Sequence, residues 1–293
     1  MGEVLVEALQ AVIRTYYHVL DGRRFDRELE GARVGGFVFD PTGGEPERTV
    51  VLVHGLGDAS TTWWSIVPAL RERTRLVVPD MPPFGVSELA QGYALVPEEH
   101  ARLLAPIVAE HATGPTTVVG QSMGGWIVQW LARQRPELVD GAVLVATAGA
   151  RLEGSFDAVD LLTPHSPEET RAYLDALWYR TPIGVGAVLD EVTRRLHEPR
   201  IRAFLRATEI GHTLTAEDLA AVEVPVHVVW GREDGLLDAG TPAWLAEHWG
   251  GPVQRTYLAR AGHMIHRERP EALVGFVEAM ADRVEAAARP VPS

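Results

Sequence analysis

The segment Gly120-Gln121-Ser122-Met123-Gly124 constrains the fold more than any other part of the chain. It follows the apolar run 116–119, which is typical of a buried strand, and it precedes the stretch 125–135, which has a helical pattern. Glycine on both sides of a serine permits a sharp turn, because a Cβ there would obstruct it. The sequence therefore predicts a strand, a tight turn that presents the Ser122 hydroxyl, and a helix that begins beneath it.

Strand and helix patterns alternate along most of the chain from residue 34 onward. We expect strands at 34–39, 49–53, 75–78, 116–119, 139–146, 224–230 and 253–258, and helices at 61–70, 97–111, 125–135, 241–248 and 271–287. Such alternation predicts an α/β fold with a mostly parallel, doubly wound sheet.

The alternation stops between residues 150 and 215, where short helical stretches are broken by prolines and no strand pattern is found. We interpret this segment as a helical cap, or lid, inserted where open α/β sheets bind their ligands. The expected organisation is an amphipathic helical segment over 1–30, a core over 31–149 and 216–293, and the cap over 150–215.

A serine hydroxyl is a weak nucleophile at neutral pH, and it requires a histidine base oriented by a carboxylate. After a turn of this kind, the acid precedes the histidine in the chain. His263 follows the last expected strand on a loop and is the favoured base. His248 lies within a helical pattern and His266 follows three residues after His263, so both remain as weaker alternatives.

The acid should follow the strand at 224–230. Asp234 is favoured, because Gly231 and Gly235 bracket a turn that can direct its carboxylate toward the loop of His263. Glu233 and Asp238 are the alternatives. Asp234 could also form only a local Asx-turn, although this would not explain its position at the expected edge of the sheet.

Two backbone N–H groups are needed to stabilise the oxyanion that attack by a serine creates. Met123 follows the nucleophile and begins the helix, so its N–H is one candidate. Leu56 is the second, because it lies between two glycines in the loop after the strand at 49–53. His54 opens the same loop, and we interpret it as a loop-bracing residue rather than as a second base.

The composition excludes several classes of function. The formal net charge of −13 argues against nucleic acid and anionic membranes as partners. The chain contains no cysteine, so it has no thiol nucleophile and no thiolate metal site. It also contains no lysine, which excludes a Schiff base and a phosphate-loop lysine.

The first twenty residues repeat apolar side chains at helical spacing, but Glu3 and Glu7 stand where a signal peptide is positively charged. We expect an amphipathic helix packed on the body of a cytoplasmic protein. The alternative is a helix that contacts a lipid surface. No apolar run is long enough to span a bilayer.

Four groups of residues together resemble the α/β-hydrolase superfamily. They are His54-Gly55-Leu56-Gly57, Gly120-Gln121-Ser122-Met123-Gly124-Gly125, Gly231-Arg232-Glu233-Asp234 and Gly262-His263. A fifth segment, residues 80–87, is similar to the D-x-P-G-x-G-x-S motif of the family, with Pro83 in place of a glycine. Within the superfamily, the leading helix and the stretch 54–64 resemble the serine esterase and monoacylglycerol-lipase-like branch.

This resemblance implies ester hydrolysis through an acyl-serine, without a cofactor or a metal. Ser122 would attack, His263 would transfer the proton, Asp234 would orient His263, and Leu56 with Met123 would hold the oxyanion. The expected substrates are short- to medium-chain esters, with monoacylglycerols among the candidates. The alternatives are a carbon–carbon hydrolase of vinylogous diketones with the same fold, and a non-catalytic receptor for a small ligand. The sequence does not predict an oligomeric state.

Four further residues are candidates for the substrate pocket. Trp63 and Trp64 follow the Leu56 loop and either line the acyl pocket or anchor the first helix of the core. Trp178 belongs to the apolar part of the cap, and Met264 adjoins His263, where its flexible side chain could form an adaptable apolar wall.

Overall fold

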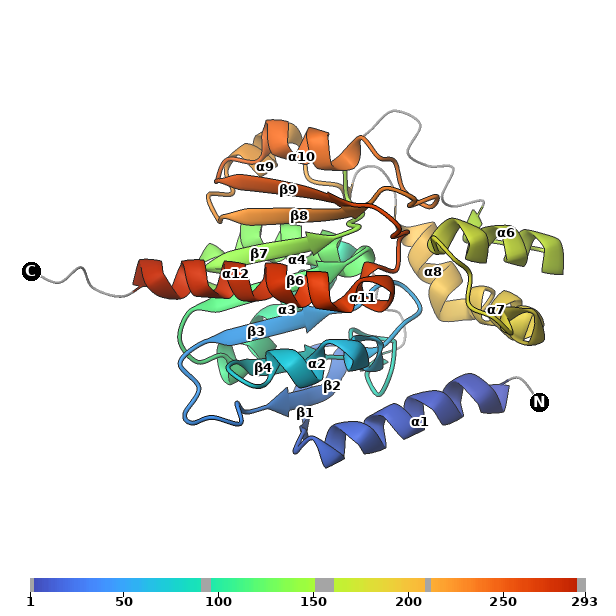
Figure 1. Cartoon of the computed structure of the whole chain (residues 1–293), viewed down its shortest axis with the longest axis horizontal. Coiled ribbons are helices and arrows are strands. Elements are labelled where there is room, and N and C mark those ends of the chain that lie inside the picture. Colours follow the sequence, from blue (N-terminus) through green and yellow to red (C-terminus); the bar gives the residue numbers. More distant parts are fainter. Residues whose placement is uncertain (1–2, 91–95, 151–160, 209–211, 289–293) are drawn as a thin grey trace, which may run out of the picture.

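The computed structural model of the chain describes residues 3–90, 96–150, 161–208 and 212–288. Its centre is a nine-stranded sheet with the order β1-β2-β4-β3-β6-β7-β8-β9, in which β5 pairs with β2 (Figure 1). The strands are β1 (Arg23–Leu29), β2 (Ala32–Phe39), β3 (Thr49–Val53), β4 (Arg75–Pro79), β5 (Glu88–Leu89), β6 (Thr116–Gln121), β7 (Gly141–Val145), β8 (Val226–Gly231) and β9 (Val253–Leu258).

Helices cover both faces of this sheet and one of its ends (Figure 1). They are α1 (Glu3–Val19), η1 (Ser60–Ser65), α2 (Val67–Leu70), α3 (Pro97–His111), α4 (Met123–Gln134), η2 (Pro136–Leu138), α6 (Pro167–Leu177), η4 (Val185–Val188), α7 (Leu189–Leu196), α8 (Pro199–Ala207), α9 (Ala216–Ala220), α10 (Thr241–His248), α11 (Ile265–Glu268) and α12 (Pro270–Ala288).

The predicted α/β fold with a mostly parallel sheet is confirmed. β4, β3, β6, β7, β8 and β9 pair in parallel, whereas β1 and β2 form an antiparallel hairpin whose second strand also pairs antiparallel to β4. The strands β3, β6, β7 and β8 are buried along their whole length. This is the reason why they read as continuous apolar runs in the sequence.

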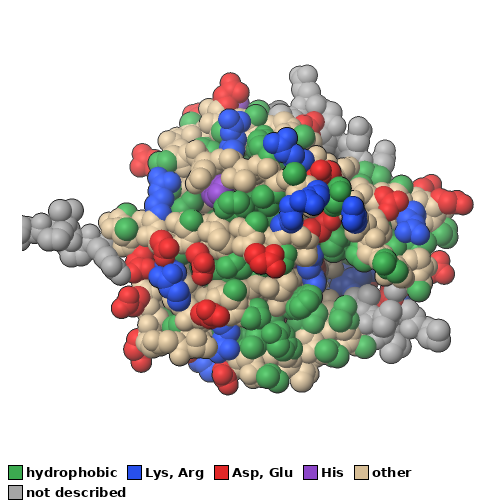
Figure 2. Space-filling model, in the orientation of Figure 1, with side chains coloured by type: hydrophobic (Ala, Val, Ile, Leu, Met, Phe, Trp, Pro, Cys, Tyr) green, Lys and Arg blue, Asp and Glu red, His purple; other side chains and the backbone are tan. Residues whose placement is uncertain are grey.

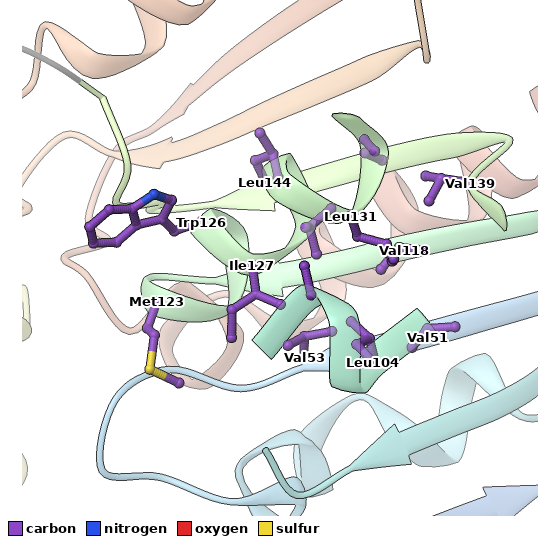
Figure 3. Packing of buried hydrophobic residues seen from close by; sticks show 14 of the residues in the cluster. Val51, Val53, Leu104, Val118, Met123, Trp126, Ile127, Leu131, Val139 and Leu144 are labelled. Carbon is purple, nitrogen blue, oxygen red and sulfur yellow. The ribbon is translucent and has the colours of Figure 1, made fainter. Parts of the chain in front are cut away.

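Two apolar layers hold the helices on the sheet. Because side chains alternate along a strand, Val51 and Val53 face one layer while Val50 and Leu52 face the other. Figure 3 shows the first layer, where α4 and Leu104 of α3 cover Val51, Val53 and Val118. The second layer packs under α1, α2 and α12.

The strand β1 is a difference from the sequence-based prediction, which placed a helical segment over 1–30. Helix α1 occupies the first part of that segment, but Arg23–Leu29 pairs with β2 over its whole length. Its side chains are exposed except for Phe25 and Leu29, which are half-buried against the first layer, so no clear apolar alternation marks it as a strand. The strand is defined instead by its backbone pairing with β2 over seven residues.

The expected helix at 61–70 is also different, since it divides into the 3₁₀ helix η1 and the short helix α2. In the predicted cap, α6, α7 and α8 gather at one end of the sheet (Figure 1). Residues 151–160 and 209–211 of that predicted cap lie outside the described residues.

Helix α1 is amphipathic, as expected, and packs on the body through Ile13 and Tyr17. Its other face exposes apolar side chains, and hydrophobic side chains gather over α1 in Figure 2. These exposed side chains are Leu9, Val12, Tyr16 and Val19. None of the helices in the described ranges is long and apolar enough to cross a membrane. Contact with a lipid surface stays a prediction.

The fold depends on glycine where α4 approaches the sheet. A Cβ on Gly124 would lie 2.2 Å from the carbonyl oxygen of Val53, so the substitution Gly124→Ala must displace backbone. We expect it to lower the free energy of unfolding by about 1–3 kcal/mol. The control is Gly275→Ala in α12, where a Cβ meets nothing within 4 Å. That change should raise stability by about 0.5–1 kcal/mol. Urea unfolding measures both, and equal effects would contradict the prediction.

Candidate active site

Ser122 occupies a strained turn between β6 and α4. Its backbone has φ 54° and ψ −118°, a region that L-residues rarely adopt. The flanking glycines allow this turn because a Cβ on Gly120 would lie 2.4 Å from the carbonyl oxygen of Gly124. The Ser122 N–H donates to the Val145 carbonyl at 3.0 Å, which fixes the turn to the neighbouring strand. The predicted strand–turn–helix arrangement is thus present.

His263 and Asp234 form a buried pair beside this turn. Nδ1 of His263 lies 2.9 Å from Oδ2 of Asp234, and the two side chains are 3% and 0% exposed. The other carboxylate oxygen of Asp234 accepts hydrogen bonds from the N–H groups of Leu236 and Leu237. Asp234 therefore forms a local Asx-type turn and also holds the histidine, so the two interpretations of this residue are compatible.

The alternative acids make other contacts. The Glu233 carboxylate accepts a hydrogen bond from the Ala261 N–H, and the Asp238 carboxylate accepts one from the Gly240 N–H. Among the described residues, Asp234 is the one whose carboxylate is hydrogen-bonded to His263.

The other candidate histidines are engaged elsewhere. Nε2 of His266 lies 2.8 Å from the Thr62 hydroxyl, and Nδ1 of His248 lies 2.8 Å from the Trp244 carbonyl. The buried His54 accepts the Met81 N–H at Nε2, so its Nδ1 carries the proton and donates to the Gly55 carbonyl. His54 thus braces two loops, which agrees with its expected role.

The loop after β3 lies directly against the serine. A Cβ on Gly55 would lie 2.3 Å from the side-chain oxygen of Gln121 and 3.3 Å from Cβ of Ser122. The Asp58 N–H donates to the Gly55 carbonyl at 3.3 Å, which closes a turn around Leu56. The N–H groups of Leu56 and Met123 donate no hydrogen bond to any residue in the described ranges, so both are available to a ligand.

A cavity of about 280 Å³ brings these groups together. Ser122 and His263 line it, and so do Leu56 and Met123. Most of the remaining wall is apolar and comes from both the core and the cap. It includes Trp126, Leu162, Tyr173, Leu177, Phe204, Leu205, Leu236, Leu237 and Met264. The described wall contains the acids Asp58 and Asp238 and neither lysine nor arginine.

The model of the alpha/beta hydrolase fold family matches residues 48–270. The chain belongs to that family. Two relatives at similar identity carry different names. A 2-hydroxymuconate semialdehyde hydrolase from Pseudomonas sp. (strain CF600) is 29% identical over 280 residues, which cover 87% of this chain and 94% of the relative. An esterase from Mycobacterium tuberculosis is 26% identical over 277 residues, which cover 87% and 89%.

Solved structures agree with the family assignment at the level of the fold. A bacterial membrane phospholipase A superposes with a TM-score of 0.78 at 22% identity, over 96% of this chain and 93% of that one. Together, the family and the relatives make the protein a hydrolase, while its substrate is a separate question.

Three aromatic residues expected at the substrate pocket of the hydrolase lie elsewhere. Trp63 is fully buried in the layer under α1 and α12, with its ring 5.0 Å from that of His266. Trp64 is 42% exposed, and Arg267 lies over its ring. Trp178 packs beside the apolar cluster of α6 rather than on the cavity wall.

Met264 does line the cavity, and so do three aromatic residues that the sequence analysis did not identify: Trp126, Tyr173 and Phe204. Trp126 could have been found, because it lies on α4 one helical turn after Ser122. The other two belong to the cap, whose packing on the core has no local signal in the sequence.

Charged groups surround the Leu56 loop. Burial alone would raise the pKa of Asp58, but the Arg267 guanidinium and a hydrogen bond from Thr62 outweigh it and lower that pKa. Burial and the nearby Asp58 carboxylate raise the pKa of the Tyr173 phenol. At neutral pH, the cavity wall therefore holds an ionised carboxylate and a neutral phenol.

No group of three His, Cys, Asp or Glu side chains in the described ranges is arranged to hold a metal.

The buried His266 makes stability depend on pH. Burial, with the Arg267 charge, lowers its pKa from 6.5 to about 3. Between these values the unfolded chain binds a proton that the folded chain does not, so stability is lost as the pH falls below about 6.5. We expect the wild type to lose about 2 kcal/mol more than His266→Gln between pH 7 and pH 5, measured by urea unfolding. Equal losses would contradict the shift.

Proposed function

We propose that this hydrolase cleaves carboxylic esters through an acyl-serine intermediate, with Ser122 as nucleophile, His263 as base and Asp234 as the acid that orients the base. The observation that carries the proposal is that His263, held by the buried Asp234, lines the same cavity as a serine in a strained turn. An ordinary surface serine would require neither the strain nor the buried pair.

The chemical steps follow from these positions. Asp234 accepts the Nδ1–H of His263, so Nε2 is free to take the proton of the Ser122 hydroxyl as its oxygen attacks the ester carbonyl. The resulting oxyanion is stabilised by the N–H groups of Leu56 and Met123, and by the N-terminus of α4. His263 then returns the proton to the leaving alcohol, and water repeats the sequence to release the acid.

Size and charge of the cavity support a neutral substrate of modest length. Its volume of about 280 Å³ lies near the lower end of the range for small-molecule sites, roughly 300–1,000 Å³. The apolar wall suits an acyl chain, and the described wall offers no cation to a substrate carboxylate. Short- to medium-chain esters fit these limits, short monoacylglycerols among them.

Carbon–carbon hydrolysis is the second candidate, because a 2-hydroxymuconate semialdehyde hydrolase is 29% identical over most of both chains. The same serine and histidine would serve that reaction. The cavity wall argues against it, since a muconate-type substrate carries a carboxylate and the described wall has two acids of its own. A carbon–carbon hydrolase would cleave vinylogous diketones at a higher kcat/KM than p-nitrophenyl esters.

A series of p-nitrophenyl esters tests the proposal. We expect kcat/KM to be highest for chains of about four to eight carbons, because a small, mostly apolar cavity favours short acyl chains. Ser122→Ala should lower kcat by about three orders of magnitude or more. Circular dichroism shows whether that variant is folded. If folded Ser122→Ala keeps its rate, or if the wild type hydrolyses none of these esters, the proposal fails.

The acid can be tested by two matched substitutions. Asp234→Asn should lower kcat by about 10⁴-fold with little change in KM, because the amide favours the wrong tautomer of His263. Asp238→Asn should cost less than tenfold, because the carboxylate of Asp238 bonds the Gly240 N–H instead. Steady-state kinetics with p-nitrophenyl butyrate measures both. The reverse ranking would assign the acid to Asp238.

A further inference from the structure

The cap contacts the Leu56 loop at one peptide carbonyl. Arg195 of α7 donates two hydrogen bonds to the carbonyl oxygen of Gly57, from Nη2 at 2.9 Å and from Nε at 3.3 Å. A guanidinium that bonds one oxygen with two N–H groups is held in orientation as well as in position. This contact joins a helix of the cap to the residue that follows Leu56.

Gly57 is the conformationally special residue of that loop. Its φ is +73°, which L side chains rarely adopt, and it lies within the turn closed by Asp58 and Gly55. A second cap helix also rests on it, since a Cβ at Gly57 would lie 3.1 Å from Cδ1 of the buried Ile201 on α8. Two helices of the cap therefore meet the loop at the same glycine.

We propose that Arg195 is a positioning residue, which holds the Gly57 carbonyl on the cap side and thereby keeps the Leu56 N–H directed into the cavity. The inference rests on the proposed function, because it assigns a purpose to Arg195 only if Leu56 stabilises an oxyanion. Without a Cβ, Gly57 can adopt several backbone conformations, and a change there would displace the adjoining Leu56. Donors for an oxyanion act strongly only when they need no reorganisation during the reaction.

The surroundings of Arg195 favour this role over a direct contact with substrate. Arg195 is not among the residues that line the cavity, whereas Asp58 and Tyr173 are. The charge of Arg195 acts on the pKa of Tyr173, and the charge of Arg267 acts on the pKa of Asp58. Its Nε and Nη2 already bond Gly57. The guanidinium thus lies behind the cavity wall, with the oxyanion loop between it and the reacting atoms.

The test replaces Arg195 by methionine, which keeps most of the stem and removes the donors. With p-nitrophenyl butyrate, kcat should fall by about 10- to 100-fold while KM changes less than about threefold. The control is Arg171→Met on α6, an exposed arginine of the same cap whose guanidinium makes no hydrogen bond to any described residue. Its kcat should stay within twofold of the wild type.

A second readout separates positioning from a merely structural role. A trifluoromethyl ketone of matched chain length forms a tetrahedral adduct with the serine and places an oxyanion in the site. Its inhibition constant should rise in Arg195→Met by the same factor by which kcat/KM falls. The inhibition constant of the corresponding amide, which resembles the ground state, should change less than about threefold. Arg195→Lys, which keeps a cation and N–H donors but not the paired geometry of the guanidinium, should fall between Arg195→Met and the wild type.

The outcomes distinguish the two proposals. If the wild type hydrolyses no ester, the proposed function fails and this inference with it. If the wild type is active and Ser122→Ala is not, but folded Arg195→Met keeps kcat within twofold, only the inference fails. A rise in KM with unchanged kcat would make Arg195 a substrate contact instead. If thermal melting shows Arg195→Met to be unfolded, Arg195→Gln and Arg195→Lys are judged by the same criteria.

Discussion

The close approach of the first turn of α4 to the end of β3 is the constraint on which the rest of the site depends. Gly124 packs so near the Val53 carbonyl that no side chain fits between them. Since Val53 pairs with Gly120 in the parallel ladder, the loop after β3 and the turn after β6 begin at the same level. The serine and the Leu56 loop are therefore adjacent before any cap residue contributes.

The pairing register of β8 and β9 brings Asp234 and His263 together in the same way. Gly231 of β8 pairs with Leu258 of β9, so the loops that follow these two strands start side by side. Asp234 lies three residues beyond one strand and His263 five beyond the other, which is short enough for their side chains to meet. The order of the chain and the shared edge of parallel strands predicted where this pair lies, and the glycines around Asp234 favoured it over Glu233 and Asp238.

Prediction from the sequence failed where local pattern and tertiary packing disagree. β1 lacks apolar alternation because it is an edge strand on which only Phe25 and Leu29 are half-buried against the core, so its pairing with β2 defines it. Trp63 and Trp64 follow the Leu56 loop closely in sequence, but η1 turns one into the core and the other to the surface. Tyr173 and Phe204 reach the cavity from cap helices, whose placement depends on contacts that are distant in the chain.

His263 and the Leu56 loop lie far apart in the chain, and buried polar contacts fix their relative positions. The Thr62 hydroxyl bonds Nε2 of His266, and the Ser65 hydroxyl donates to the His266 carbonyl at 2.6 Å. The charge of Arg267 also acts on Asp58, the residue next to Gly57. Such contacts are directional and costly to leave unmade in a buried site, whereas apolar packing tolerates small shifts. These contacts tie the segment after His263 to the segment after Leu56. The relative position of His263 and Leu56 is therefore set by hydrogen bonds of neighbouring residues, not by their own.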